Sequence, residues 1–228
     1  MLARVLEPEV MDKPEEARDY DAMDFAAVNG RFVADFVAAH GPGRGGEVLD
    51  VGTGPARIAI TLCRADREIR VLGVDLAGPM LDLGRRNVAD AGLADRIRFA
   101  RGDAKNLPFP DGRFAAVISN TIIHHIPDPA LALAEMVRLV ADGGTLFVRD
   151  LARPADAAAV EELVERHTAG EPPAARALLR DSLHAGLTLD EVRAIVAGLG
   201  PDPEGVRMTS DRHWTWTWHK PAGAEPRA

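Results

Sequence analysis

The sequence predicts an α/β fold built on a mostly parallel sheet, and two patterns carry that prediction. Short continuous apolar runs, typical of strands buried on both faces, alternate with segments whose apolar residues recur at helical spacing. Short connections join the runs to the segments, as in successive βαβ units. The fold class therefore follows from the order of the elements alone.

The first 150 residues contain this regular alternation. A helix is expected over 23–39, and the breaker Gly41-Pro42-Gly43 ends it. Strands are then predicted at 47–51, 70–75, 97–101, 114–120 and 145–149, and helices at 56–64, 79–91 and 129–140. Gly92 closes the second of these helices and Gly143-Gly144 ends the third.

After Asp150 the alternation stops. Helices are expected over 155–169 and 173–185, and Thr188 to Glu191 has the spacing of a capping box that opens a third helix to about Leu199. Strands are predicted at 206–209 and 214–218, separated by a hairpin-length connection. The tail from Pro221 is rich in Pro, Gly and Ala, which predicts disorder.

Composition limits the classes of partner. The 228 residues, 46% of them hydrophobic, suit one domain, which we expect over 1–220. The net charge of −8 argues against nucleic acid or an anionic membrane as a partner. One cysteine excludes an intramolecular disulfide and any multi-cysteine metal site. No signal peptide and no apolar run of ~18 residues is present, so a cytoplasmic protein without a membrane span is expected, as a monomer or a homodimer.

A glycine-containing loop follows the first predicted strand. It reads from Asp50 through Gly52, Thr53 and Gly54 and then enters a helix. In open α/β sheets such loops lie at the carboxyl ends of strands, where ligands bind, although a tight turn without a ligand has the same sequence. A dinucleotide loop needs a third glycine where Arg57 stands, and a P-loop needs a Lys-Ser/Thr pair that is absent. The loop therefore favours a ligand without a pyrophosphate.

Acidic residues stand at the ends of three consecutive strands. Asp75 ends the second strand and Asp103 follows the third, as Asp50 does the first. A carboxylate at Asp75 can accept hydrogen bonds from ribose hydroxyls, and one at Asp103 from an exocyclic amine such as that of adenine. Each acid alone could equally be a helix N-cap or a solvated loop residue. Together they favour a nucleoside site at one edge of the sheet.

The segments VLDVGTGPARIAI, GVDLAGPML, GDAKNLPF and FAAVISNTIIHHIPDP resemble the successive motifs of class I S-adenosylmethionine-dependent methyltransferases. The resemblance runs from about Glu47 to Asp150 and is strongest to the small-molecule branch, which includes the quinone-biosynthesis enzymes. It implies a Rossmann-like, doubly wound sheet of seven strands with an antiparallel last strand. Residues 1–40 and 151–186 lie outside the regular alternation, and we expect them to form a helical cap over the active edge.

The resemblance further implies which residues hold S-adenosyl-L-methionine and its product S-adenosyl-L-homocysteine. The glycine loop would approach the methionine part, Asp75 the ribose, Asp103 and Ala104 the adenine, and Asn120 the reaction centre. The third glycine of the family motif is Ala56 here. The full set expected to bind the cofactor is Tyr20, Asp50, Gly52, Thr53, Gly54, Asp75, Leu76, Asp103, Ala104 and Asn120.

Methyl transfer from a sulfonium depends largely on orientation and exclusion of water, but a hydroxyl or carbon acceptor also needs a base. The candidate catalytic residues are histidines and a carboxylate near strand ends: His124, His125, His213 and Asp150. Packing roles are the alternative for the histidines. Arg153, Arg180 and Trp214 are the candidates for binding the substrate, with surface ion pairs or core packing as the alternatives.

The sequence favours a small-molecule acceptor, with oxygen or carbon slightly preferred over nitrogen. The stretch from Asn120 to Ile123 lacks the Asn/Asp-Pro-Pro-aromatic signature of enzymes that methylate amino groups of nucleic acids. No acidic cluster for magnesium follows the fourth strand, so no metal is expected. Two alternatives stay open: a catalytically silent S-adenosylmethionine-binding sensor or partner protein, and an oxidoreductase on a related fold.

Overall fold

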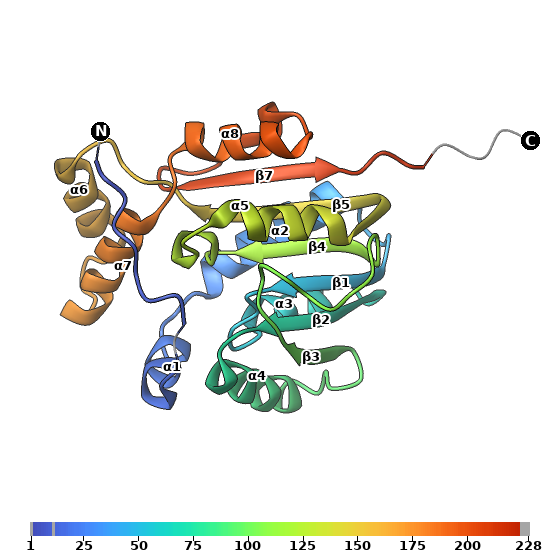
Figure 1. Ribbon diagram of the computed structural model, residues 1–228. Coiled ribbons are helices and arrows are strands. Elements are labelled where there is room, and N and C mark those ends of the chain that lie inside the picture. Colours follow the sequence, from blue (N-terminus) through green and yellow to red (C-terminus); the bar gives the residue numbers. More distant parts are fainter. Residues whose placement is uncertain (1, 11, 224–228) are drawn as a thin grey trace, which may run out of the picture. The chain divides into compact units, whose positions relative to one another are not determined.

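The computed structural model describes residues 2–10 and 12–223. In these residues the strands form one seven-stranded sheet in the order β3-β2-β1-β4-β5-β7-β6, and Figure 1 labels β3, β2, β1, β4, β5 and β7. The pairs β1–β2, β1–β4 and β2–β3 are parallel, whereas β6 and β7 are antiparallel. The predicted α/β class, with a mostly parallel seven-stranded sheet and antiparallel last strands, is confirmed. No helix in these two ranges has the length and apolar content needed to cross a membrane.

Most element bounds agree with the sequence to within three residues. The strands are β1 (Gly46–Val51), β2 (Ile69–Asp75), β3 (Ile97–Arg101), β4 (Phe114–Asn120), β5 (Val140–Leu151), β6 (Val206–Met208) and β7 (His213–His219). The helices are α1 (Pro14–Asp21), α2 (Ala26–His40), α3 (Arg57–Ala65), α4 (Gly78–Asp90), α5 (Pro129–Leu139), α6 (Ala157–His167), α7 (Pro173–Ala185) and α8 (Leu189–Leu199), with short 3-10 turns η1 (Ile123–His125) and η2 (Pro203–Gly205).

The strand β5 is longer than predicted. Gly143 and Gly144 were expected to separate a helix from a strand, yet the strand runs through them. The cause is a long-range pairing, because the Gly143 N–H donates to the Lys220 carbonyl at 3.0 Å and the Lys220 N–H donates to the Gly144 carbonyl at 3.0 Å. The predicted tail lies outside the described residues from 224 onward.

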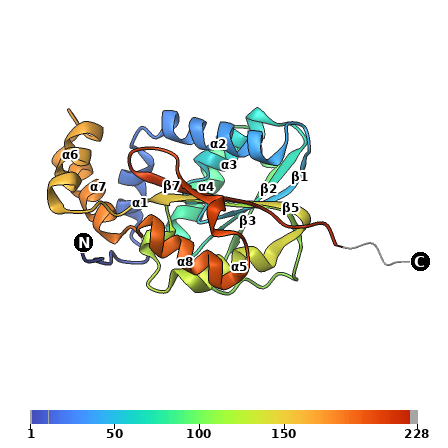
Figure 2. The same ribbon diagram turned by 90° about the horizontal axis from the view of Figure 1, so that it is seen from above.

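The chain divides into two compact units, each made of several stretches. Unit 1 comprises 1–9, 121–130 and 149–216, and unit 2 comprises 10–120, 131–148 and 217–228. In unit 2, α2 and α3 cover one side of the strands, while α5 lies on the other (Figure 2). A cluster of buried side chains that includes Phe32, Phe36, Leu62 and Val71 fills the space between the strands and the first of these layers.

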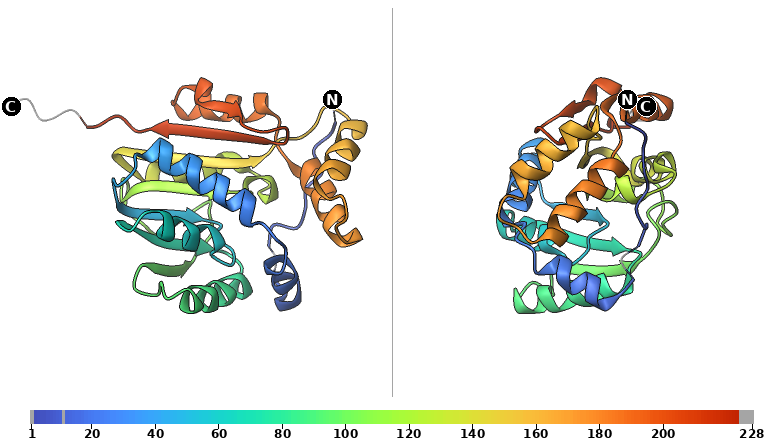
Figure 3. Two further views of the ribbon diagram at one scale, coloured as in Figure 1. Left: turned by 180° about the vertical axis from the view of Figure 1, so that it is seen from behind. Right: turned by 90° about the vertical axis from the view of Figure 1, so that its left-hand side faces the viewer.

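Unit 1 contains the helices that follow β5. Helices α6 and α7 lie side by side (Figure 3). Val160 and Val164 on α6 and Leu183 on α7 form a small core together with Leu151. Asp156 caps α6 by accepting from the Ala159 N–H at 2.9 Å. The predicted capping box of α8 is present, with Thr188 and Glu191 each bonding the other's backbone N–H. Local capping thus fixes where these helices begin.

Candidate cofactor-binding site

The loop after β1 is held in place by hydrogen bonds within unit 2. The Asp50 side chain is buried, and its Oδ2 accepts a hydrogen bond from the Thr53 hydroxyl at 2.7 Å. The backbone N–H groups of Gly52 and Thr53 both donate to the Val74 carbonyl on β2. Gly54 has a φ of +52°, a left-handed conformation that glycine adopts at no steric cost. The loop therefore presents backbone rather than side chains above the end of the sheet.

Asp75 joins this loop to the second strand. Its Oδ2 accepts from the Gly54 N–H at 2.8 Å and its Oδ1 accepts from the Ala77 N–H at 2.9 Å. Burial raises the pKa of Asp75, and the backbone N–H groups that donate to it partly oppose that rise. The carboxylate is thus fixed between the glycine loop and the start of α4.

Asp50 is the most strongly perturbed acid of this group. Burial raises its pKa to about 7, Thr53 opposes the rise, and the charge of Asp75 adds to it. A buried carboxylate with no cation beside it is costly to ionise. A positively charged ligand group would relieve that cost, so the pair of acids suits a cationic partner.

The other predicted cofactor residues lie at the ends of β2, β3 and β4. Asp103 is partly exposed, and it accepts from the Lys105 N–H at 2.9 Å and pairs with Lys105 Nζ at 3.0 Å. Burial would raise its pKa, but these contacts outweigh burial and lower it. The Leu76 carbonyl accepts from Arg101, Ala104 follows Asp103 in the chain, and Asn120 ends β4 half-buried. Parallel pairing of β1, β2 and β3 brings the three acids to one edge.

Tyr20 lies on α1, which packs on α4 in the same unit. Its ring lies 5.2 Å from that of Phe25. The helix is tied to α3 because Asp21 accepts two hydrogen bonds from the Arg57 guanidinium, at 2.8 and 3.0 Å. Sequence reasoning treated Arg57 only as the residue that replaces a glycine. The structure gives it a bidentate contact that holds the helix bearing Tyr20.

Three of the four predicted catalytic residues meet in unit 1. His124 Nδ1 lies 2.6 Å from Asp150 Oδ1, and both side chains are buried. Burial lowers the pKa of His124 and raises that of Asp150, but their mutual attraction outweighs burial, so the pKa of His124 is raised and that of Asp150 is lowered. The His125 ring lies beside that of His124, with ring centroids 4.1 Å apart and the ring planes tilted by 37°. Burial, followed by the charge of His124, lowers the pKa of His125 to about 4.

Through its ring, His213 forms a hydrogen bond with Ser210 and not with the members of that cluster. Its Nδ1 bonds the Ser210 hydroxyl at 2.9 Å, and its backbone N–H donates to the same oxygen at 3.0 Å. Burial lowers its pKa to about 4, so the ring is neutral at neutral pH. These contacts fix the ring at the start of β7.

The three predicted substrate residues are all in unit 1. Arg153 is buried, and its guanidinium donates to the Gly186 carbonyl and to Glu191 Oε1. Arg180 pairs with Glu161 at 2.6 Å on the exposed sides of α7 and α6. Trp214 is fully buried, and its indole N–H has no hydrogen-bond partner among the described residues. Arg153 lines a hollow of about 370 Å³ together with Glu162, Arg166 and Asp211.

Glu7 is the polar residue that sequence reasoning missed. Its Oε2 lies 3.1 Å from His125 Nδ1, and its side chain is 10% exposed. Burial raises its pKa, and a hydrogen bond from Ser182 lowers it in part. Glu7 sits in a charged segment without periodicity, so no local signal pairs it with a histidine more than a hundred residues away.

Comparisons with known proteins find methyltransferases. Residues 48–144 match a family model described as a methyltransferase domain. The chain is 34% identical over 113 residues to a demethylmenaquinone methyltransferase of Bacteroides fragilis, covering 50% of this chain and 46% of that protein. It is 33% identical over 115 residues to the ubiquinone/menaquinone biosynthesis C-methyltransferase UbiE of Azotobacter vinelandii, covering 50% and 46%. The chain therefore spans about half the length of these curated relatives.

Solved structures show the same fold. The structure of a candidate S-adenosyl-L-methionine-dependent methyltransferase from Methanococcus maripaludis superposes with a TM-score of 0.72, at 18% identity, covering 97% of this chain and 99% of that one. The matched sequence begins on β1 and ends on β5, so it contains the glycine loop, Asp75 and Asp103. Residues 48–144 of the chain thus match a methyltransferase domain, and quinone-biosynthesis methyltransferases are among the proteins that the chain is similar to.

Proposed function

We propose that the chain transfers a methyl group from S-adenosyl-L-methionine to a small-molecule acceptor. The observation that carries the proposal is the Asp75–Gly54 hydrogen bond beside the buried Asp50. This arrangement offers a ribose-binding carboxylate, a loop free of bulky side chains and an acid that favours a cation. These are the needs of a cationic nucleoside ligand, and the curated relatives are named as methyltransferases.

The residues of unit 2 that are expected to bind the cofactor have defined parts in this proposal. The Asp75 carboxylate accepts from the ribose hydroxyls, Asp50 faces the ammonium of the amino-acid end beside the glycine loop, and Asp103 with Ala104 and Leu76 surrounds the adenine. Tyr20 and Asn120 complete the contacts near the methionine part. S-adenosyl-L-methionine supplies, when bound, a methyl group already activated by its sulfonium charge.

The acceptor completes the reaction. Its lone pair or carbanion forms the new bond to the methyl carbon while the carbon–sulfur bond breaks and the electron pair passes to sulfur. A hydroxyl or weakly acidic carbon also loses a proton, which a base must take. The candidate bases remain His124, His125, Asp150 and His213, and the candidate substrate contacts remain Arg153, Arg180 and Trp214. We also propose that residues 1–40 and 151–186 form a helical cap that shapes the acceptor pocket.

The test compares ligands and then acceptors. S-adenosyl-L-homocysteine is expected to raise the melting temperature of the full chain, whereas NAD is not. Transfer of labelled methyl groups to a panel of phenols, hydroquinones and amines, followed by mass spectrometry, identifies the acceptor class. Stabilisation by NAD alone would overturn the proposal in favour of an oxidoreductase. Binding of S-adenosyl-L-homocysteine without transfer to any acceptor would favour a silent sensor instead.

A further inference from the structure

We propose that unit 1 binds one divalent transition-metal ion of the zinc type through Glu7, His124 and His125. One potential ligand atom from each side chain lies within 4.8 Å of the other two. Two imidazoles and one carboxylate form a ligand set used by catalytic zinc sites and by non-haem iron sites. The inference concerns binding alone and does not depend on the methyl transfer proposed above.

The contact between Glu7 and His125 is the first support. Glu7 Oε2 lies 3.1 Å from His125 Nδ1, yet this buried nitrogen has no hydrogen-bond partner within residues 2–10 and 12–223. The other carboxylate oxygen of Glu7, Oε1, is also buried and has no hydrogen-bond partner in the part of the chain that the structure describes, and the side chain is nine-tenths buried. Leaving such atoms unsatisfied costs free energy. A cation held between them would satisfy both.

The orientation of His124 is the second support. Asp150 Oδ1 lies 2.6 Å from His124 Nδ1, and Asp150 is itself fixed by the backbone N–H groups of Ile123 and Leu151, each at 2.6 Å. A carboxylate that accepts from one ring nitrogen of a histidine sets the tautomer and leaves the other nitrogen as a metal ligand. Asp150 thereby acts as a positioning residue, and His124 Nε2 becomes the ligand atom.

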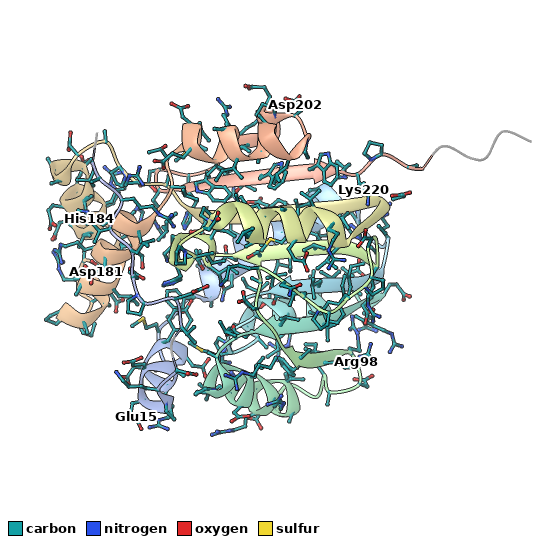
Figure 4. The ribbon with its side chains drawn as sticks, in the orientation of Figure 1. Glu15, Arg98, Asp181, His184, Asp202 and Lys220 are labelled. Atoms are coloured by element: carbon teal, nitrogen blue, oxygen red, sulfur yellow. The ribbon has the colours of Figure 1, made fainter. Side chains whose placement is uncertain are left out.

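The N-terminal segment brings Glu7 to the two histidines. The Leu2 N–H donates to the Ala155 carbonyl and the Val5 N–H to the carbonyl of His184, a residue of α7 labelled in Figure 4. The Arg4 guanidinium donates to the carbonyls of Ala185, His124 and Ile126 at 2.8, 3.0 and 3.0 Å. The segment is thus fixed to η1 and α7 of its own unit by its backbone and by Arg4, so little ordering is needed on binding.

The ligand set also determines which cation fits. Imidazole nitrogens suit zinc, cobalt and iron, whereas magnesium prefers an all-oxygen shell. Three protein ligands leave at least one coordination position for water or another small ligand. We therefore expect zinc and cobalt to bind and magnesium not to compete.

The experiment uses the full chain after removal of metal with a chelator. Titration calorimetry with Zn²⁺, and the visible absorption spectrum with Co²⁺, should both show one ion per chain. Glu7→Gln and His125→Gln should each weaken binding by about 100-fold or more, and Asp150→Asn by about 10- to 100-fold, the range for residues that orient a ligand. His167→Gln is the matched control, because His167 pairs with Asp211 elsewhere in unit 1. It should leave the affinity unchanged.

Three results would overturn the proposal. The first is the lack of saturable Zn²⁺ binding by folded wild-type chain, checked by circular dichroism. The second is equal loss of affinity in His167→Gln and Glu7→Gln, which would indicate adventitious surface binding. The third is a Co²⁺ spectrum that is the same in wild type and in both folded ligand variants. Because S-adenosyl-L-homocysteine binding is measured separately, a failure here is distinguishable from failure of the proposed function.

Discussion

Asp75 Oδ2 accepts a hydrogen bond from the Gly54 N–H at 2.8 Å, so the end of β2 holds the glycine loop that follows β1. The same carboxylate bonds the Ala77 N–H through its other oxygen, at the start of α4. One side chain therefore joins three elements of unit 2. A residue with this position affects both the shape of the loop and any ligand bound above it.

Replacing Asp75 with Ala should weaken binding of S-adenosyl-L-homocysteine by about 10- to 150-fold. The expected loss is about 1.5–3 kcal/mol, the usual value of a hydrogen bond to a charged group. Titration calorimetry measures it directly. Asp82→Ala is a matched control, since Asp82 is an acid on α4 that forms an exposed pair with Arg85. An affinity in Asp75→Ala equal to that of the control would refute the ribose role.

The raised pKa of Asp50 predicts a pH dependence of ligand binding. Its pKa is about 7 in the free protein, and a bound ammonium group requires the ionised form. Affinity for S-adenosyl-L-homocysteine should therefore fall by about tenfold for each pH unit below 7, because the ionised fraction falls by that factor. Asp50→Asn should bind more weakly at pH 8 and lose this slope. A wild-type affinity that stays constant from pH 8 to pH 5.5 contradicts the assignment.

The same shift predicts how stability depends on pH. The reference pKa of Asp50 is 3.8 and the folded value is about 7, so between these values the folded state retains a proton that the unfolded state has lost. The free energy of unfolding should therefore decrease as pH rises from about 4 to about 7 by this contribution. Urea titrations of wild type and Asp50→Asn across this range isolate it. If the difference in free energy of unfolding between wild type and Asp50→Asn does not change with pH, the pKa of Asp50 is not raised as stated.

Local patterns were sufficient for most of the fold. The strands at 97–101 and 114–120 and the helix at 173–185 have the predicted bounds, because apolar periodicity, glycines and prolines act within a few residues. The extension of β5 could not be predicted in this way. It depends on pairing of Gly143 and Gly144 with Lys220, far along the chain. Long-range pairing overrides a local helix-stop signal there.

The candidate site divides along the same line. Asp75 and the loop from Asp50 to Gly54 were predictable, because each follows a buried strand and parallel strands end at one edge. The contact of Glu7 with His125 was not, since it depends on how the N-terminal segment folds back on its own unit. The Arg57–Asp21 contact was likewise not predictable, because it joins residues that are far apart in the sequence. Chemistry at strand ends is visible in a sequence, whereas side chains brought together by distant segments are not.

The Arg57–Asp21 contact predicts how firmly α1 is held. Arg57→Met should release the helix locally, because both guanidinium hydrogen bonds to Asp21 are lost. The Arg57 side chain is half-exposed, so the pair is worth about 0.2–1 kcal/mol, and amide exchange over 14–21 should accelerate by up to about fivefold. Hydrogen-exchange mass spectrometry measures this. Arg64→Met, on the same helix α3, should leave exchange in α1 unchanged, and equal acceleration in both variants would contradict the contact.

The left-handed backbone at Ala56 predicts that a glycine substitution there changes the free energy of unfolding very little. Ala56 precedes α3 with a φ of +63°, a conformation that costs a residue with a Cβ about 1–2 kcal/mol. Ala56→Gly removes that cost but loses a buried methyl group and gains chain entropy in the unfolded state, so its free energy of unfolding should stay within about 1 kcal/mol of wild type.

Ala59→Gly is the matched control for this effect. Ala59 is equally buried but lies inside α3, so glycine there loses the methyl group and helix propensity without relieving strain. The control should be less stable than Ala56→Gly by about 1–2 kcal/mol, measured from urea midpoints at constant m-value. If both variants lose the same free energy, the left-handed backbone at Ala56 carries no strain. The alanine would then replace the family's third glycine at no conformational cost.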